Sequence, residues 1–396
     1  MNRRELLKTS LLGLGAGAMA LSGCNKKEAE PDINQDITPK QTAQYEFSAP
    51  MPFDYQTIDK IIALNSTLKK SRVTTFYNNI PMPLVRGFDQ FVQVHRGFNE
   101  TIRNYEDFKN IVQYSIANGF KFVYLMNSPK PFSPEDFNMF QGEFMHLLDY
   151  LEKIGCSDIK VGNTQVAELI NQIAPNKFTL SSSTSFEYHN VSQYHYLFNN
   201  YPNFDLIDIS NDENHNFPFL RSLRKTFPDK KLELMINEPC IKGCPARISH
   251  IAEYGFCKYN CHALQEKMGE YFFFYKLGSI YPWNLEYYSA LGINNFKYSA
   301  SGSMGGRANY NDISQLSMYL NMVEHGIKNY SADDFFNGIY ERRFNIRKDL
   351  KIADVIPYMP DVHHFIKHGD KCAINCDVNC HYCELCGKRT ENFLNS

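Results

Sequence analysis

Nine of the eleven cysteines fall into two groups with the short, regular spacing of ligands that converge on one metal centre. The first group reads C-x3-C-x12-C-x3-C, and the second places five cysteines within fifteen residues near the C-terminus. Thiolates are the ligands of iron–sulfur clusters and of structural zinc, so this pattern predicts metal chemistry. The first group is Cys240, Cys244, Cys257 and Cys261, and the second is Cys372, Cys376, Cys380, Cys383 and Cys386.

The first group has the spacing of a single four-thiolate centre. Each C-x3-C pair places two sulfurs one helical turn apart, on the same side if the segment is helical. Two such pairs supply four ligands, which suits a [4Fe-4S] cluster, and zinc is the alternative because it also takes four thiolates. Zinc sites use C-x2-C knuckles more often than C-x3-C, so the spacing favours iron–sulfur.

The second group contains C-x3-C-x2-C at Cys376, Cys380 and Cys383, the spelling of the radical-SAM signature. That signature follows the first strand of its barrel, whereas this one ends thirteen residues before the C-terminus, which argues against radical-SAM chemistry. We expect four of the five cysteines to hold a second [4Fe-4S] cluster or a zinc ion. Two clusters within reach of each other would form an electron relay. Disulfides are the remaining alternative, but cysteines this close in sequence bridge poorly.

The N-terminus carries two signals for export. Arg3 and Arg4 precede Leu-Leu-Lys and a Gly/Ala-rich apolar run, which is typical of a twin-arginine signal for proteins exported already folded. The sequence Leu21-Ser-Gly-Cys24 resembles a lipobox, in which the cysteine is acylated and becomes the first residue of the mature chain. We therefore expect a signal peptide over residues 1–24 and a lipid on Cys24 that anchors the protein to a membrane. Its location would be the cell envelope, on the periplasmic or extracytoplasmic face.

Composition narrows the function further. The 396 residues are 43% hydrophobic and 14% aromatic, enough for a large core. The net charge of -2 gives no general attraction to nucleic acid, so we expect no nucleic-acid partner. The chain also shows no Ser-His-Asp or H-E-x-x-H pattern, which leaves a hydrolase without a sequence signature.

The elements that must position the cysteines alternate between short β-prone runs and amphipathic helical stretches. Strand–helix alternation at this spacing favours a (β/α)8 barrel, with an eighth strand expected in the less regular 80–100 region. We expect a flexible tether over 25–50, the barrel over 51–330, and a cysteine-rich C-terminal lobe over 331–396. The expected strands are Val73–Tyr77, Phe120–Met126, Ile159–Gly162, Phe178–Ser181, Phe204–Ile209, Leu232–Ile236 and Phe296–Ser299, and the expected helices include Tyr105–Ala117, Asp136–Ile154, Val166–Ile173, Phe217–Phe227, Asn284–Leu291 and Asp312–His325.

From about Phe120 to Lys328 the chain resembles the peptidase U32 (collagenase-like) family. The resemblance rests on Glu233–Arg247, which reads ELMINEPCIKGCPAR, on the pair Cys257-x3-Cys261, and on Gly292–Ser299, which reads GINNFKYS. It implies a TIM-like barrel, a four-cysteine [4Fe-4S] cluster, and a relation to proteins that hydroxylate RNA or ubiquinone without dioxygen. An exported protein does not meet RNA, so the resemblance points to a small-molecule substrate.

One departure from the family pattern bears on the site. The arginine that the family carries directly after its lysine strand is displaced here to Arg307, ten residues beyond Lys297. By charge and by position near strand ends, Arg247, Lys297 and Arg307 are candidate anchors for an anionic substrate. The sequence thus predicts redox chemistry, either oxygen-independent hydroxylation or electron transfer, with a redox partner. The alternative is a non-enzymatic envelope binding module in which zinc or iron–sulfur is only structural.

Overall fold

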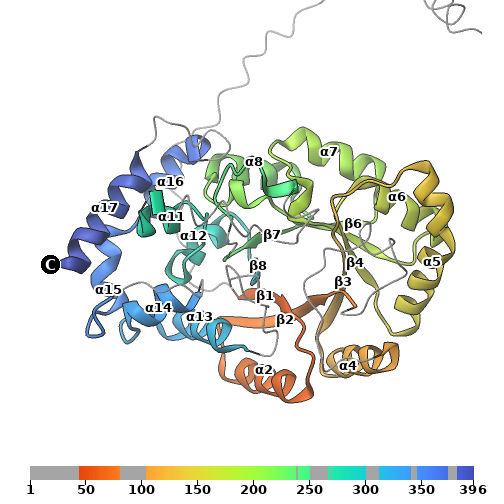
Figure 1. Ribbon diagram of the computed structural model, residues 1–396, viewed down its shortest axis with the longest axis horizontal. Coiled ribbons are helices and arrows are strands. Elements are labelled where there is room, and N and C mark those ends of the chain that lie inside the picture. Colours follow the sequence, from red (N-terminus) through yellow and green to blue (C-terminus); the bar gives the residue numbers. More distant parts are fainter. Residues whose placement is uncertain are drawn as a thin grey trace, which may run out of the picture. The chain divides into compact units, whose positions relative to one another are not determined.

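Eight parallel strands close into a barrel in the computed structural model of the protein (Figure 1). Each strand pairs with the next in sequence, and β8 pairs with β1 to close the ring. The structure describes residues 44–80, 104–237, 240–249, 266–267, 269–299, 312–339, 346–372 and 381–396. The strands are β1 (Tyr45–Pro50), β2 (Ser71–Asn78), β3 (Lys121–Met126), β4 (Asp158–Val161), β5 (Thr179–Ser182), β6 (Phe204–Asp208), β7 (Lys231–Met235) and β8 (Asn295–Lys297). The predicted (β/α)8 barrel is therefore confirmed.

The position of the eighth strand was predicted wrongly. The eighth strand of the closed barrel is β1, within the segment expected to be tether. Of the 80–100 region, residues 81–100 lie outside the described part of the chain. β1 contributes the pairing Phe47↔Val73 on one side and Phe47↔Phe296 on the other, so it belongs to the closed sheet. The barrel therefore begins at Tyr45, inside the segment expected to be tether, and residues 25–43 of that segment lie outside the described part of the chain.

Helices follow the strands and form the outer layer of the barrel (Figure 1). Side-chain caps fix where several of them begin: Asn104 caps α4, Ser133 and Asp136 form a capping box on α5, and Asn163 caps α6. The helices are α2 (Tyr55–Thr67), α4 (Tyr105–Ala117), α5 (Pro134–Lys153), α6 (Thr164–Ile173), α7 (Val191–Asn200), α8 (Phe217–Thr226), α11 (Glu270–Tyr275), α12 (Leu285–Ala290), α13 (Ser314–His325), α14 (Ala332–Ile339), α15 (Ile352–Val355), α16 (Val362–His368) and α17 (Tyr382–Asn395).

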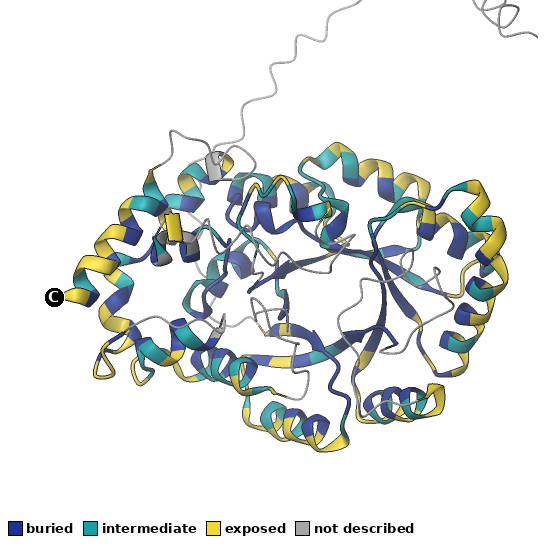
Figure 2. Cartoon of the chain, in the orientation of Figure 1, coloured by how far each residue is buried: buried dark blue, intermediate teal, exposed yellow. Residues whose placement is uncertain are grey.

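The hydrophobic core lies between the strands and the helices. Outward-facing strand residues such as Phe47, Phe76 and Phe296 are fully buried there against the inner faces of the helices. Figure 2 shows the strands mostly dark and the helices dark on one side and exposed on the other. Inside the barrel the residues are largely polar and charged, among them Lys160 and Glu233. Buried charge of this kind is costly unless it is paired, and Lys160 and Glu233 form an ion pair with each other.

The C-terminal residues are continuous with the barrel rather than an appended lobe. Asp36–Ser396 is one compact unit, and Phe335, Phe365 and Leu394 are buried in the same core as the strands. At Gly369 an added Cβ would lie 2.1 Å from the carbonyl oxygen of His215, so only glycine fits where this backbone meets the loop after β6. The expected boundary at residue 330 therefore does not separate two cores. No helix among the described residues is long and apolar enough to cross a membrane.

Candidate functional site

Two cysteines of the first group lie in the loop that follows β7, at the C-terminal end of the barrel where enzymes of this fold carry their active sites. Cys240 and Cys244 are partly exposed, and neither forms a disulfide. Cys257 and Cys261 lie outside the described residues, as do Cys24, Arg307, Cys376 and Cys380. The structure thus describes one half of the predicted four-thiolate site.

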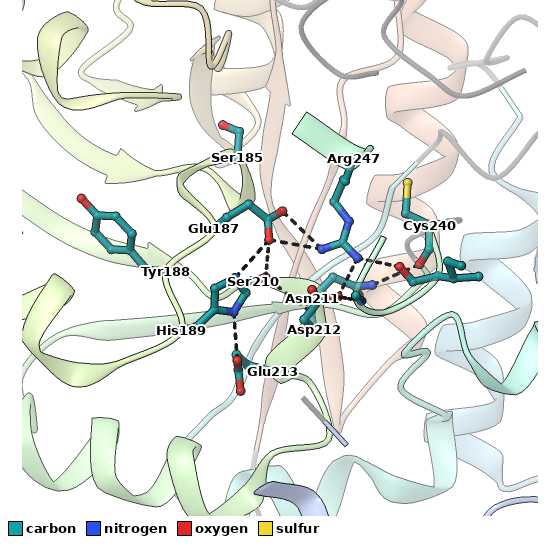
Figure 3. Close-up of polar contacts among 12 residues, drawn as sticks. Ser185, Glu187, Tyr188, His189, Ser210, Asn211, Asp212, Glu213, Cys240 and Arg247 are labelled. Carbon is teal, nitrogen blue, oxygen red and sulfur yellow. Dashed lines mark hydrogen bonds and ion pairs between the residues drawn. The ribbon is translucent and has the colours of Figure 1, made fainter. Parts of the chain in front are cut away.

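The Cys240–Cys244 loop is held in place by Asp212, which stands on the loop after β6 (Figure 3). One oxygen of Asp212, Oδ1, accepts the backbone N–H of Gly243 at 3.0 Å and Nη2 of Arg247 at 2.6 Å. The same Nη2 donates to the carbonyl oxygen of Ile241 at 2.7 Å. Gly243 has φ of +67°, which a residue with a side chain rarely adopts. The loop is therefore held by contacts within the chain itself.

Two buried cations, Lys242 and Arg247, lie on the same segment as Cys240 and Cys244. Lys242 is 6% exposed, and its Nζ lies 2.7 Å from Nδ1 of His215 and 5.3 Å from the centre of the Phe365 ring. No carboxylate lies within ion-pair distance of Lys242 among the described residues. Arg247 is 5% exposed, and its Nε has no hydrogen-bond partner in the described part of the structure.

These two cations bear on whether the loop suits a thiolate-held metal. A buried ammonium without a counter-ion and an orphaned buried N–H are both costly, and an anionic group beside them removes both costs. Nearby positive charge also favours the thiolate form of cysteine, which is the form that binds metal. Burial acts to lower the pKa of Arg247, but Glu187 and Asp212 raise it, and a negative charge on Cys240 would add to that rise. The described half of the site therefore fits an anionic metal–thiolate centre, and it fits iron–sulfur and zinc equally.

Next to this loop lies an acid–base cluster that sequence reasoning missed, built from Glu187 after β5 and from Asp212 and Glu213 after β6 (Figure 3). Nδ1 of His189 lies 2.9 Å from Oε1 of Glu213, and its Nε2 lies 3.5 Å from Oε2 of Glu187. Glu187 also accepts Nη1 of Arg247 at 3.3 Å. Burial acts to lower the pKa of His189, but the two carboxylates outweigh it and raise that pKa to about 9. His189 is therefore a charged imidazolium at neutral pH.

Ligand atoms of Glu187, His189 and Asp212 lie within 4.8 Å of one another, the reach of a metal site. Arg247 already stands between the two carboxylates, however, with its nitrogens 2.6 Å and 3.3 Å from their oxygens. A guanidinium in that position supplies the positive charge that a metal would bring. The cluster is thus an ion-pair network, and Arg247 joins it to the cysteine loop.

Two of the predicted anion anchors, Arg247 and Lys297, already contact carboxylates in the structure. Both terminal nitrogens of Arg247 are engaged by carboxylates, which leaves Nε as its open donor among the described contacts. Lys297 is buried inside the barrel, 3.0 Å from Oδ2 of Asp208 and 4.7 Å from the centre of the Tyr77 ring. Anion anchoring by these two residues stays a prediction, but neither offers an uncompensated charge.

The second cysteine group is described at Cys383 and Cys386, which are 7% and 2% exposed on α17. α17 packs along α11, and the Tyr275 hydroxyl lies 2.7 Å from Oγ1 of Thr390 across that contact. Cys372 ends the short helix Gly369–Cys372, which begins at the close contact with His215.

Cys156, outside both groups, is buried as expected, and burial raises the pKa of its thiol to about 12.

No family model and no curated protein match this chain in sequence. Among solved structures it is similar to a U32 peptidase, with a TM-score of 0.43 and 13% identity over 67% of this chain and 96% of that one. It is also similar to N-acetylneuraminate lyase from Fusobacterium nucleatum, with a TM-score of 0.35 and 13% identity over 89% of this chain and 99% of that one. A third is 2,3-dimethylmalate lyase, with a TM-score of 0.32 and 8% identity over 65% and 76%. These likenesses concern the barrel fold alone.

Proposed function

We propose that this chain is an exported, lipid-anchored iron–sulfur protein of the U32-like type. In this proposal Cys240, Cys244, Cys257 and Cys261 hold a [4Fe-4S] cluster at the C-terminal end of the barrel. The chemistry is oxygen-independent hydroxylation of a small molecule, or electron transfer to a partner. The observation that carries the proposal is the hydrogen-bonded loop that holds Cys240 and Cys244 outside any disulfide, with the buried cations Lys242 and Arg247 on the same segment.

The residues around the loop have distinct roles in this proposal. Cys240 and Cys244 supply two thiolates, and Asp212 holds the loop that carries them through Gly243 and Arg247. Arg247 offers its free Nε–H to an anionic group at the thiols. Such a cluster, when bound, exchanges single electrons. The charged His189 stands beside the loop, one-fifth exposed, as a proton donor for a bound small molecule.

A second candidate is a binding module without catalysis, in which the metal is a staple. The observation that favours it is the burial of Cys383 and Cys386 in the packing of α17 against α11. Buried ligands at a helix–helix contact are typical of a structural site, and zinc is the usual metal there. On this account the C-terminal group ties the chain's end to the barrel.

Metal content of variants separates the two candidates. The full chain, purified without air, should contain iron and acid-labile sulfide, and Cys244→Ser should remove about four irons per chain. Cys156→Ser is the matched control, because Cys156 is buried and lies outside both groups, and it should leave the metal unchanged. If the wild type instead contains zinc, and Cys244→Ser removes that zinc, the result would support the structural module.

Export and anchoring are tested separately. Changing Arg3 and Arg4 to lysine should leave the folded protein in the cytoplasm if the signal is of the twin-arginine type. Changing Cys24 to Ala should release the exported protein from membranes, because the acyl chain supplies the anchoring. Unaltered membrane association of the Cys24 variant would refute the lipid anchor and would leave the metal proposal untouched.

A further inference from the structure

The two ring nitrogens of His189 contact two different carboxylates, and the proposed function does not say which nitrogen acts (Figure 3). Nδ1 lies 2.9 Å from Oε1 of Glu213, which is an ordinary hydrogen-bond distance. Nε2 lies 3.5 Å from Oε2 of Glu187, which is too long for a strong hydrogen bond. The Glu213 side chain is 1% exposed, and the Glu187 side chain is 19% exposed. Nδ1 is therefore bound to a buried partner, whereas Nε2 faces a partly exposed one.

The Glu213 carboxylate is held in place by its own neighbours. Its second oxygen, Oε2, accepts Nδ2 of Asn216 at 2.6 Å. Asn216 cannot turn its amide around without cost, because its Oδ1 accepts the backbone N–H of Phe219 at 3.2 Å as the N-cap of α8. The backbone N–H of Glu213 donates to the carbonyl oxygen of Ser210 at 2.9 Å. The carboxylate thus has one position, and the ring that hydrogen-bonds to it takes its orientation from it.

The backbone on the other side of this contact is fixed as well. The N–H of His189 donates to Oε1 of Gln193 at 2.8 Å, and Gln193 belongs to the capping box that begins α7. Glu187, two residues before His189, has φ of +47°, a left-handed conformation that costs a residue with a side chain some strain. Strained residues of this kind gather at functional sites. Both partners of the His189 ring are therefore part of a segment with a defined conformation.

We propose that Glu213 is a positioning residue that keeps a proton on Nδ1 of His189, so that Nε2 is the atom that exchanges protons at the C-terminal end of the barrel. An ionised carboxylate only accepts hydrogen bonds, so the contact with Glu213 requires a proton on Nδ1 whether the ring is charged or neutral. The inference deepens the proposed function, on which it rests for the bound small molecule, and it needs no metal.

The step itself is a proton transfer. The Nε2–H bond of His189 breaks, the proton forms a bond to an oxygen or nitrogen of the bound molecule, and the electron pair of the broken bond stays on Nε2. The ring then recovers a proton at Nε2 from water, and no electron changes owner. Throughout the cycle Nδ1 keeps its proton against Glu213. This is the division of labour of a histidine that a buried carboxylate orients.

The groups around the ring agree with this assignment. Burial acts to lower the pKa of His189, but the two carboxylates raise it to about 9, so Nε2 carries a proton at neutral pH. Glu187 is shared, since it also accepts Oγ of Ser210 at 3.0 Å and Nη1 of Arg247 at 3.3 Å. In the described part of the chain, the titratable groups around His189 are Glu187 after β5, Tyr194 on α7, Asp212 and Glu213 after β6, and Arg247 after β7.

Nitrogen-15 NMR of the full chain with labelled histidine tests the assignment directly. His189→Gln identifies the two ring signals, because its spectrum lacks them. As the pH rises from about 7 to about 10.5, the wild-type Nε2 signal should move to the position of a nitrogen without a proton, and the Nδ1 signal should stay that of an N–H. A histidine free in water favours the opposite neutral form. A wild-type ring that loses its Nδ1 proton instead would overturn the proposal.

Glu213→Gln sharpens the test, because it should reverse which nitrogen keeps the proton. The donor Nδ2 of Asn216 selects the carbonyl oxygen of the new side chain, which turns the NH2 group toward the ring and makes Nδ1 an acceptor. Glu168→Gln, an exposed change on α6, is the control and should match the wild type. If the folded Glu213→Gln variant keeps its Nδ1 proton, Glu213 is not the positioning residue.

The wild-type spectrum decides the question even if Glu213→Gln fails to fold. The metal content of the same samples is a separate reading. A chain without iron would count against the proposed function and leave the proton assignment standing, whereas an Nε2–H form in an iron-containing wild type would refute only the proton assignment.

Discussion

Replacing His189 by Gln should destabilise the protein at neutral and mildly acid pH, and the effect should disappear in base. The His189 ring lies between Glu187 and Glu213, which raise its pKa from 6.5 to about 9. A basic group with a raised pKa in the folded state contributes stability that is fully present below its pKa in the unfolded chain. That contribution is then lost as the pH rises through the folded-state value. The window for His189 therefore runs from about pH 6.5 to about pH 9.

The magnitude follows from the same values. Each pH unit between the two pKa values corresponds to about 1.4 kcal/mol, which gives an upper figure of about 3 kcal/mol. The ring is 20% exposed, and solvent screening reduces the effective charge interaction. We therefore expect Gln, which hydrogen-bonds but carries no charge, to lower the free energy of unfolding by about 1–2 kcal/mol at pH 6.

Urea unfolding followed by tryptophan fluorescence measures this difference, because Trp283 is the single tryptophan of the chain. The urea midpoints of the wild type and the variant should differ most at pH 6 and converge by about pH 10. His146→Gln, an exposed change on α5, is the matched control and should leave the midpoint unchanged at each pH. A difference for His189→Gln that is the same at pH 6 and pH 10 would show that its cause is not charge, and the reasoning would be refuted.

Four further predictions test the fold and the site. Gly369→Ala should lower the free energy of unfolding by several kcal/mol and expose the C-terminal residues to proteases, since its Cβ would meet the backbone of the loop after β6. Gly142→Ala, with open space at its Cβ inside α5, should instead stabilise by about 0.5–1 kcal/mol in the same urea assay. Lys160→Met should cost about 3–5 kcal/mol, because it leaves two buried carboxyls without their shared cation, and an equally stable variant would argue against the ion pairs. In the metal-free chain, iodoacetamide should modify Cys240 at neutral pH much faster than Cys156, whose pKa of about 12 keeps it a thiol; mass spectrometry of peptides would reveal a reversed order.

Most of the barrel could be predicted from the sequence because its strands are apolar runs separated by amphipathic helices. The strand that was missed explains the limit of this approach. In β1, Glu46 and Ser48, which line the barrel cavity, alternate with Tyr45 and Phe47, which belong to the hydrophobic core. A strand with a polar inner face beside a proline-containing tether has too few apolar residues in a row to stand out.

The candidate site was predictable only in part. Cysteine spacing identified the metal-binding loop, since ligands close in sequence leave a local pattern. The cluster of Glu187, His189 and Glu213 has no such pattern, because its members come from loops after two different strands and meet only when the barrel closes. The usable signal was positional: polar residues directly after successive strands gather at the C-terminal end of a barrel. Lys160 and Glu233 gave a second signal, as charged residues between apolar neighbours within short strands.

The central claim is that the first cysteine group holds an iron–sulfur cluster, and low-temperature electron paramagnetic resonance tests it most directly. The full-length protein, purified without air and reduced with dithionite, should give the signal of a reduced [4Fe-4S] cluster, and Cys244→Ser should lack the part due to the first group. Cys156→Ser should keep the complete signal. A wild-type protein that gives no such signal and contains stoichiometric zinc would contradict the claim and leave the metal as a structural element.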